Sequence, residues 1–97
     1  PILPDSSNKK RIQRTNRFGR DIRRMSTDIQ TSAFEVTNQL ASDIFDPTIS
    51  VKPLTGFRGI YRAVVAKDHR IMFSFDDENL YLLCIGHRRD IYRNLEL

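Results

Sequence analysis

The stretch FRGIYRAVVAKDHRIMFSFDDENLYLLCIG, residues 57–86, contains three short apolar runs separated by two polar segments. The runs are rich in β-branched and aromatic residues, which favour strands over helices. The polar segments are KDH and DDEN, and Asp76, Asp77 and Asn79 suit the geometry of a tight turn. The stretch therefore predicts three consecutive antiparallel strands.

Alternation within these runs assigns side chains to two faces of the predicted sheet. In the middle run one face carries Ile71, Phe73 and Phe75, and the other carries Arg70, Met72 and Ser74. In the preceding run Tyr61, Ala63 and Val65 share a face, and Arg62 lies on the other with Ile60 and Val64. Arg62 and Arg70 interrupt apolar strands, which costs free energy unless each charge is solvated, paired or facing a ligand.

The first half of the chain has helical periodicity instead. NRFGRDIRRM, residues 16–25, places Phe18, Ile22 and Met25 at i, i+4 and i+7, with Asn16 as the expected N-cap. Residues 11–15 predict a short strand whose only apolar residue is Ile12.

A longer helix is predicted within STDIQTSAFEVTNQLASDIFDP, residues 26–47. Its apolar stripe consists of Ile29, Ala33, Val36, Leu40 and Ile44, widened by Phe34, Thr37, Ala41 and Phe45. Thr27 and Gln30 suit a capping box, and Pro47 is expected to end the helix after Asp46.

These elements predict an α+β fold in which two N-terminal helices pack on a small twisted antiparallel sheet. The helices would cover one face of the sheet and leave the other partly open. A length of 97 residues allows one domain, which we place at residues 10–97. Residues 1–9, rich in proline and small polar residues, are expected to form a flexible leader.

Charge and composition limit the classes of partner. The formal net charge is +4, which favours a polyanion such as RNA, DNA or an acidic protein. Half of the 16 basic residues lie in the first quarter of the chain, namely Lys9, Lys10, Arg11, Arg14, Arg17, Arg20, Arg23 and Arg24. Cys84 is the only cysteine, so no disulfide or thiolate metal cluster is expected, and no cofactor is predicted. No run of about 18 apolar residues is present, and a cytoplasmic location is expected.

KPLTGFRGIYRAVVAKDHRIMFSF, residues 52–75, followed by LYLLCIGHRRDIY, residues 80–92, resembles bacterial toxins of the RelE and ParE superfamily. The resemblance implies a fold similar to that of microbial ribonucleases in its active half. It also implies a toxin of a type II toxin–antitoxin system that a cognate antitoxin neutralises. RelE-type members are metal-independent endoribonucleases that cut mRNA in the ribosomal A site, whereas ParE-type members inhibit DNA gyrase.

The resemblance also nominates a catalytic set. Lys52, Arg70, Arg88 and Tyr92 match positions like those of RelE-type catalytic residues, and His87 stands where other branches have a lysine or a histidine. We expect His87 or Lys52 to act as general base, Arg70 and Arg88 to clamp the phosphate, and Tyr92 to contact the nucleotide. Supporting contacts are expected from Arg62, Arg89 and His69.

For several of these residues a purely structural role is the alternative to a catalytic one. In that case His69 is an exposed turn residue, and Tyr92 closes the core with Ile91 and Leu95. Arg62 would pair with Glu35 or Asp43, and Arg89 with Asp90. The alternative functions are a gyrase inhibitor of the ParE type without nuclease activity and an RNA-binding domain that uses the arginine-rich first helix.

Overall fold

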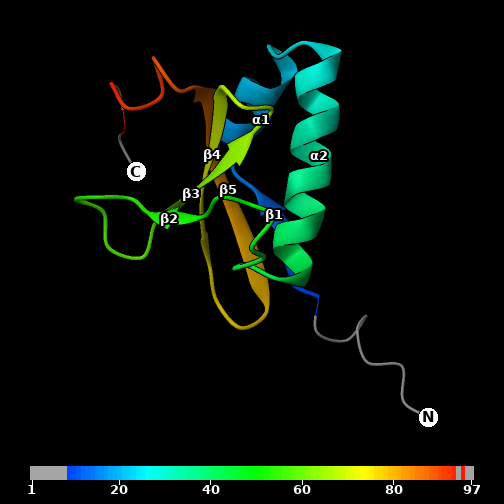
Figure 1. Cartoon of the computed structure of the whole chain (residues 1–97), viewed down its shortest axis with the longest axis vertical. Coiled ribbons are helices and arrows are strands. Elements are labelled where there is room, and N and C mark those ends of the chain that lie inside the picture. The colour runs from blue at the N-terminus through cyan, green and yellow to red at the C-terminus, as the bar shows by residue number, and fades with distance from the viewer. Residues whose placement is uncertain (1–8, 94, 96–97) are drawn as a thin grey trace.

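Two helices pack against one sheet of five strands within residues 9–93 and 95, which the computed structural model describes (Figure 1). The elements are β1 (Arg11–Arg14), α1 (Asn16–Arg23), α2 (Thr27–Ser42), β2 (Lys52–Pro53), β3 (Tyr61–Val65), β4 (His69–Phe75) and β5 (Asn79–His87). The predicted leader, residues 1–9, lies outside the described residues except for Lys9. The α+β fold predicted from the sequence is confirmed.

The sheet has the strand order β1-β5-β4-β3-β2. The predicted meander is present, because β3, β4 and β5 pair antiparallel in succession. β2 extends it and places Lys52 opposite Arg62. The direction of the strand at residues 11–14 was not predicted, and β1 runs parallel to β5 at the edge of an otherwise antiparallel sheet. A parallel neighbour needs a long connection, and both helices and three strands lie between β1 and β5 in the chain.

In both helices the N-cap lies one residue before the predicted cap. Thr15, not Asn16, caps α1, because its hydroxyl accepts a hydrogen bond from the backbone amide of Phe18 (3.1 Å). Ser26 caps α2 in place of the predicted Thr27 capping box. α2 also ends at Ser42, well before the predicted stop at Pro47, with Asp43 as its C-cap.

The larger core lies between the helices and the sheet, where α2 runs along one face (Figure 1). Its fully buried side chains include Leu40, Ile71 and Phe73, so the alternation predicted for β4 is confirmed. The predicted stripe of α2 is too wide, since Phe34 and Phe45 are 68% and 59% exposed. Within the described residues, no helix is both long and apolar enough to cross a membrane.

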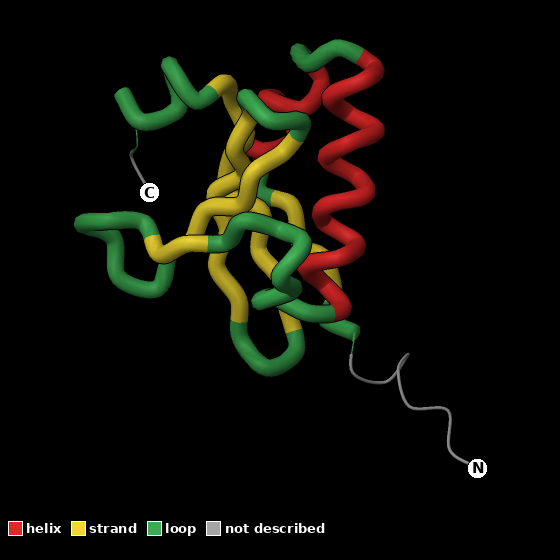
Figure 2. Tube along the Cα trace, in the orientation of Figure 1, coloured by secondary structure: helices red, strands yellow, loops and turns green. Residues whose placement is uncertain are grey.

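The opposite face of the sheet carries a smaller apolar cluster formed by Leu54, Met72, Cys84 and Ile91. Its cover comes from loops: the β2–β3 loop and the turn after β5 lie on the side of the sheet away from α2 (Figure 2). Ile91 packs against Gly86, where an added Cβ would lie 3.4 Å from the Cβ of Ile91. The glycine therefore lets the C-terminal turn approach the sheet closely.

Candidate functional site

A groove of about 450 Å³ opens on the loop-covered face, between the β2–β3 loop, β3 and the C-terminal turn. We call it the basic groove, and the side chains that line it include Leu54, Phe57, Arg62, Tyr92, Arg93 and Leu95. It combines guanidinium groups with aromatic rings, which are the groups that bind phosphates and unstacked bases. The groove is therefore suited chemically to a single-stranded nucleic acid.

Arg62 is the cation of this groove that comes from the sheet. It is half-buried, and the exposed Lys52 lies opposite it on β2. The side chain is on the face away from α2, so the expected ion pair with Glu35 or Asp43 does not form. Within residues 9–93 and 95, Arg62 makes no ion pair with any carboxylate. Its charge is available to a ligand.

Tyr92 lines the groove and is 43% exposed, whereas its neighbour Ile91 is only 6% exposed. The expectation that Tyr92 closes the core is therefore wrong, because Ile91 takes that place. Sequence reasoning missed Phe57 and Arg93 as lining residues. Arg93 directly follows the tyrosine in the nominated stretch, and that adjacency was the available signal.

A pair of histidines lies at the far end of the central strands. His69 and His87 are direct partners across β4 and β5, and their ring centroids are 5.3 Å apart at 74°. His69 is the first residue of β4 and half-buried, so its assignment to an exposed turn is wrong. Its Nδ1 atom is buried without a hydrogen-bond partner among the described residues. Burial, helped by the neighbouring His87 and Arg70, lowers the pKa of His69, while Asp68 opposes the shift.

A backbone hydrogen bond orients His87 within this pair. The Nδ1 atom accepts from the backbone amide of Arg89 at 3.1 Å, in the turn that follows β5. While this bond persists, the proton of the neutral ring resides on Nε2. Only Nε2 is then left to face a substrate, and in this state it is a hydrogen-bond donor.

The two predicted phosphate clamps are engaged with the β3–β4 turn. The Nε of Arg88 lies 3.5 Å from Oδ1 of Asp68, and both side chains are about half exposed. A terminal guanidinium nitrogen of Arg70 donates to the carbonyl oxygens of Lys67 and His69 at 2.9 Å each. The expected pair of Arg89 with Asp90 is absent from the ion pairs of the described residues. Asp68, the actual partner of Arg88, was not predicted.

The nominated residues thus form two groups and not one cluster. Arg62 and Tyr92 line the basic groove, and Lys52 lies opposite Arg62 on β2. His69, His87, Arg70 and Arg88 lie near the β3–β4 turn. The turn end of β3 is three residues from Arg62, or about 10 Å along the strand. The C-terminal turn joins the groups, since Arg88 begins it and Tyr92 lies near its end.

Comparison with known proteins identifies a fold. No protein-family model matches the chain, and no curated protein sequence matches it. The RelB–RelE antitoxin–toxin complex of Methanococcus jannaschii superposes with a TM-score of 0.71 at 16% identity, covering 87% of this chain and 99% of the matching chain. The DinJ–YafQ toxin–antitoxin complex of E. coli gives 0.70 at 15% identity, over 87% and 98%. The RelBE2 toxin–antitoxin complex of Mycobacterium tuberculosis gives 0.69 at 21% identity, over 89% and 99%.

These similarities define the chain as having the RelE-like toxin fold, which the sequence predicted. The match extends over nearly the whole of each matching chain, so both the helix pair and the sheet are shared. Identities of 15–21% establish the fold alone. Function must be argued from the residues of this chain.

Proposed function

We propose that this protein is the toxin of a toxin–antitoxin system and acts as a metal-independent endoribonuclease on mRNA at the ribosome, in the cytoplasm. The observation that carries the proposal is the basic groove, where Arg62 and Tyr92 face solvent together. The fold supports it, since the similar structures are RelE and YafQ proteins in complexes with antitoxins. The same comparison favours the RelE-type activity over the ParE-type alternative.

The reaction is an internal transesterification. The 2′-hydroxyl loses its proton to a base and its oxygen forms a bond to the adjacent phosphorus, while the bond from phosphorus to the 5′-oxygen breaks. A cyclic 2′,3′-phosphate remains on one fragment, and the departing 5′-oxygen takes up a proton. The phosphorane gains negative charge on the way, so cations held near it lower the barrier.

Arg62, with Lys52 opposite it on β2, would hold the RNA backbone at the groove, and Tyr92 would stack on a base. Arg88 would exchange its exposed partner Asp68 for the scissile phosphate when RNA binds. Arg70 would keep its bonds to the turn carbonyls and hold that turn in place, with Arg89 as a supporting cation.

His87 is the proposed proton-transfer group. It lies at the end of β5 on the face of the sheet opposite Arg62 and Arg70, so the RNA would reach it around the ends of the strands. To accept the 2′-hydroxyl proton at Nε2, the ring must carry its own proton on Nδ1, so the hydrogen bond from the Arg89 amide must be given up. That amide belongs to an exposed turn residue, and water can replace its acceptor. Lys52, which is exposed on β2, is the other candidate base.

The test is induction of the wild-type chain and of two histidine variants in cells, followed by mapping of transcript 5′ ends. His87→Asn keeps an oxygen that can accept from the Arg89 amide, but it removes the titratable ring. His87→Gln instead keeps a polar group near the position of Nε2. Because neither amide transfers protons at neutral pH, we expect both variants to lose new transcript ends by about 100-fold or more.

Arg58→Ala is the matched control, since Arg58 is exposed in the β2–β3 loop and does not line the basic groove. If His87→Asn cleaved transcripts as fully as the wild type, His87 would not be the proton-transfer group. Growth arrest with intact transcripts in the wild type would overturn the nuclease proposal and favour the gyrase inhibitor.

A further inference from the structure

One wall of the basic groove is the β2–β3 loop, which two glycines shape (Figure 2). The φ angles of Gly56 and Gly59 are +87° and +76°, in the left-handed region that glycine adopts without strain. At the base of the loop the amide of Leu54 donates to the carbonyl oxygen of Ile60 at 2.8 Å. The chain therefore reverses within a few residues, and Phe57 lies between the two glycines in the sequence.

Backbone hydrogen bonds hold Phe57 in this loop. Its amide donates to the carbonyl oxygen of Leu54 at 3.2 Å, and its own carbonyl oxygen accepts from the amide of Ile60 at 3.3 Å. The side chain is half-buried against the small apolar cluster around Leu54 and Met72, and it also lines the basic groove. Because the ring is already ordered, a ligand that contacts it causes little further loss of conformational entropy.

Tyr92 lines the same groove from the C-terminal turn, where it is 43% exposed. Among the residues that the structure describes, the rings of Phe57 and Tyr92 contact neither each other nor any further aromatic ring. The groove therefore offers two separate aromatic surfaces. A flat nucleobase stacks on such rings whichever base it is, because every base has a π-face.

The charged side chains that line this groove are arginines, namely Arg62 from β3 and Arg93 from the C-terminal turn. Within residues 9–93 and 95, neither makes an ion pair with a carboxylate, and no acidic side chain lines the groove. A guanidinium group binds phosphate oxygens through two parallel hydrogen bonds. Two rings and two guanidinium groups together match a nucleotide whose base and flanking phosphates are both accessible.

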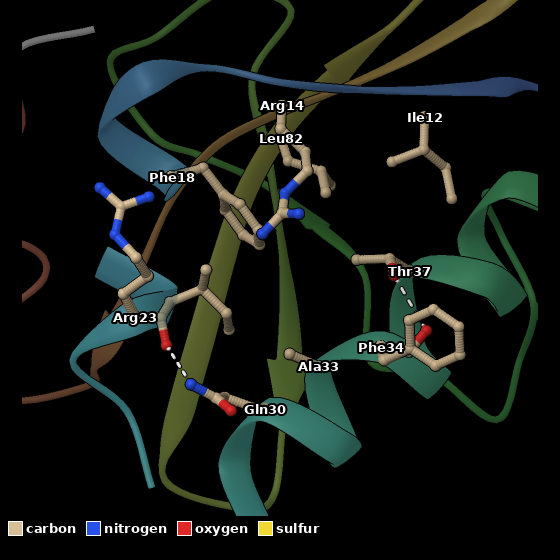
Figure 3. A pocket seen from close by; sticks show the side chains of 10 residues that line it. Ile12, Arg14, Phe18, Arg23, Gln30, Ala33, Phe34, Thr37 and Leu82 are labelled. Carbon is tan, nitrogen blue, oxygen red and sulfur yellow. Dashed lines mark hydrogen bonds between the residues drawn. The ribbon is translucent and has the colours of Figure 1, made fainter. Parts of the chain in front are cut away.

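A second groove, of about 340 Å³ on the helix side, lacks this combination (Figure 3). It also contains arginines and aromatic rings, but Phe18 is only 3% exposed, and the Arg14 guanidinium already lies over its ring, 5.6 Å from the centroid. The accessible ring of that groove is Phe34, which is 68% exposed. A base could stack there on one side only.

We propose that Phe57 and Tyr92 form a slot for one unpaired nucleobase of the RNA substrate, while Arg62 and Arg93 bind the phosphates on either side of it. This slot rests on the proposed function and names the part of the RNA that the groove holds. A base within a duplex is covered on both faces by its neighbours, so only a single-stranded segment can enter. Phe57 contacts a base and not the reacting bonds, so its role is to select the bound nucleotide.

The test measures binding of the purified chain by fluorescence anisotropy, with two uncleavable RNA strands as probes. Both strands carry 2′-O-methyl groups, and the second has abasic nucleotides throughout, so that the phosphates are the same. We expect the wild type to bind the base-bearing strand about 10-fold more tightly. Phe57→Leu should lose most of this preference, because leucine keeps the apolar contact with the Leu54 cluster but presents no ring. Phe57→Tyr restores a ring and should restore the preference.

Phe34→Leu is the matched control, since it removes an exposed ring outside the basic groove and should keep the preference. Arg93→Ala should weaken binding of both strands by a similar factor, whereas Arg58→Ala, in the same loop but outside the groove, should not.

Equal affinity of the wild type for the two strands, or no binding of either, would overturn the slot, and so would an unchanged preference in Phe57→Leu. Mapping of transcript ends in cells tests the nuclease proposal separately. If the wild type preferred the base-bearing strand but cut no transcripts, the slot would stand as part of an RNA-binding groove and the nuclease proposal would fall.

Discussion

The two faces of this sheet are built very differently. On the helix face, Phe73 of β4 and Leu40 of α2 are completely buried between the sheet and the helices. The opposite face has a small cluster around Met72 and Ile91, covered by a loop and a turn. Tight packing resists change, whereas a thin cover leaves side chains near solvent. Stability is therefore concentrated on one face, and the other is free to carry a binding site.

Removal of Phe73 from the helix face should have the largest effect. Its side chain is fully buried, so Phe73→Ala should lower the free energy of unfolding by about 3–5 kcal/mol. Ile91→Ala, on the loop-covered face, should cost less, about 2 kcal/mol, because the turn above it can adjust. Urea denaturation of both variants measures the difference. Equal losses would show that the two faces contribute alike.

Arg62→Ala should impair the proposed activity of the loop-covered face without disturbing the helix face. The side chain is half-buried and lines the basic groove, and we expect RNA cleavage to fall by about 10- to 100-fold because a phosphate contact is lost. The core on the helix face should be unaffected, because Arg62 lies on the other face. Assays of RNA cleavage and urea denaturation on one preparation compare the two faces directly. Normal cleavage by Arg62→Ala would place the substrate elsewhere.

The elements of the fold could be predicted because their signals are local. Alternation along β4 assigns Ile71 and Phe73 to one face, and the structure agrees. The direction of β1 was not predictable in this way, since its partner β5 is distant in the sequence. The sequence also does not determine how wide the buried stripe of a helix is. Whether Phe34 is buried depends on where α1 and β1 lie, and in the structure it is exposed.

The site was predictable only in part, for a geometric reason. Residues on neighbouring strands meet when their register agrees, as with Lys52 and Arg62. His87 and Arg70 come from adjacent strands, but their positions along β4 and β5 differ by one residue, which places them on opposite faces. The sequence alone contains no information on that register. The pairing of Arg88 with Asp68 depends on the same hairpin geometry.

Asp68→Asn should have a smaller effect than Arg62→Ala. It removes the ion pair with Arg88, whose side chains are 43% and 54% exposed, so the free energy of unfolding should change by less than about 0.5 kcal/mol. Cleavage should be retained or rise slightly, because the freed guanidinium can bind phosphate without exchanging partners. Single-turnover rates at low and high salt check this. A severe loss of cleavage would mean that Asp68 holds Arg88 in its working position.

The smallest effect should come from the pH dependence of His69. Burial, together with His87 and Arg70, lowers the pKa of this residue in the folded state, against the opposing charge of Asp68. Above about pH 6.5 the ring is neutral in both the folded and the unfolded chain, so it does not alter stability. As the pH falls below that value, the unfolded chain binds the proton first, and stability is lost until the folded pKa is passed.

The free energy of unfolding should therefore fall between pH 7.5 and pH 5.5 by more in the wild type than in His69→Gln. Carboxylates contribute little over this interval. The carboxylate of Asp76 contributes even less, because hydrogen bonds from the backbone amides of Glu78 and Asn79, and from the Tyr81 hydroxyl, lower its pKa. His87→Asn removes the neighbouring ring that helps to lower the pKa of His69. Equal pH dependence in the wild type and His69→Gln would show that the buried Nδ1 of His69 carries no cost on protonation, and that water reaches both rings of the histidine pair.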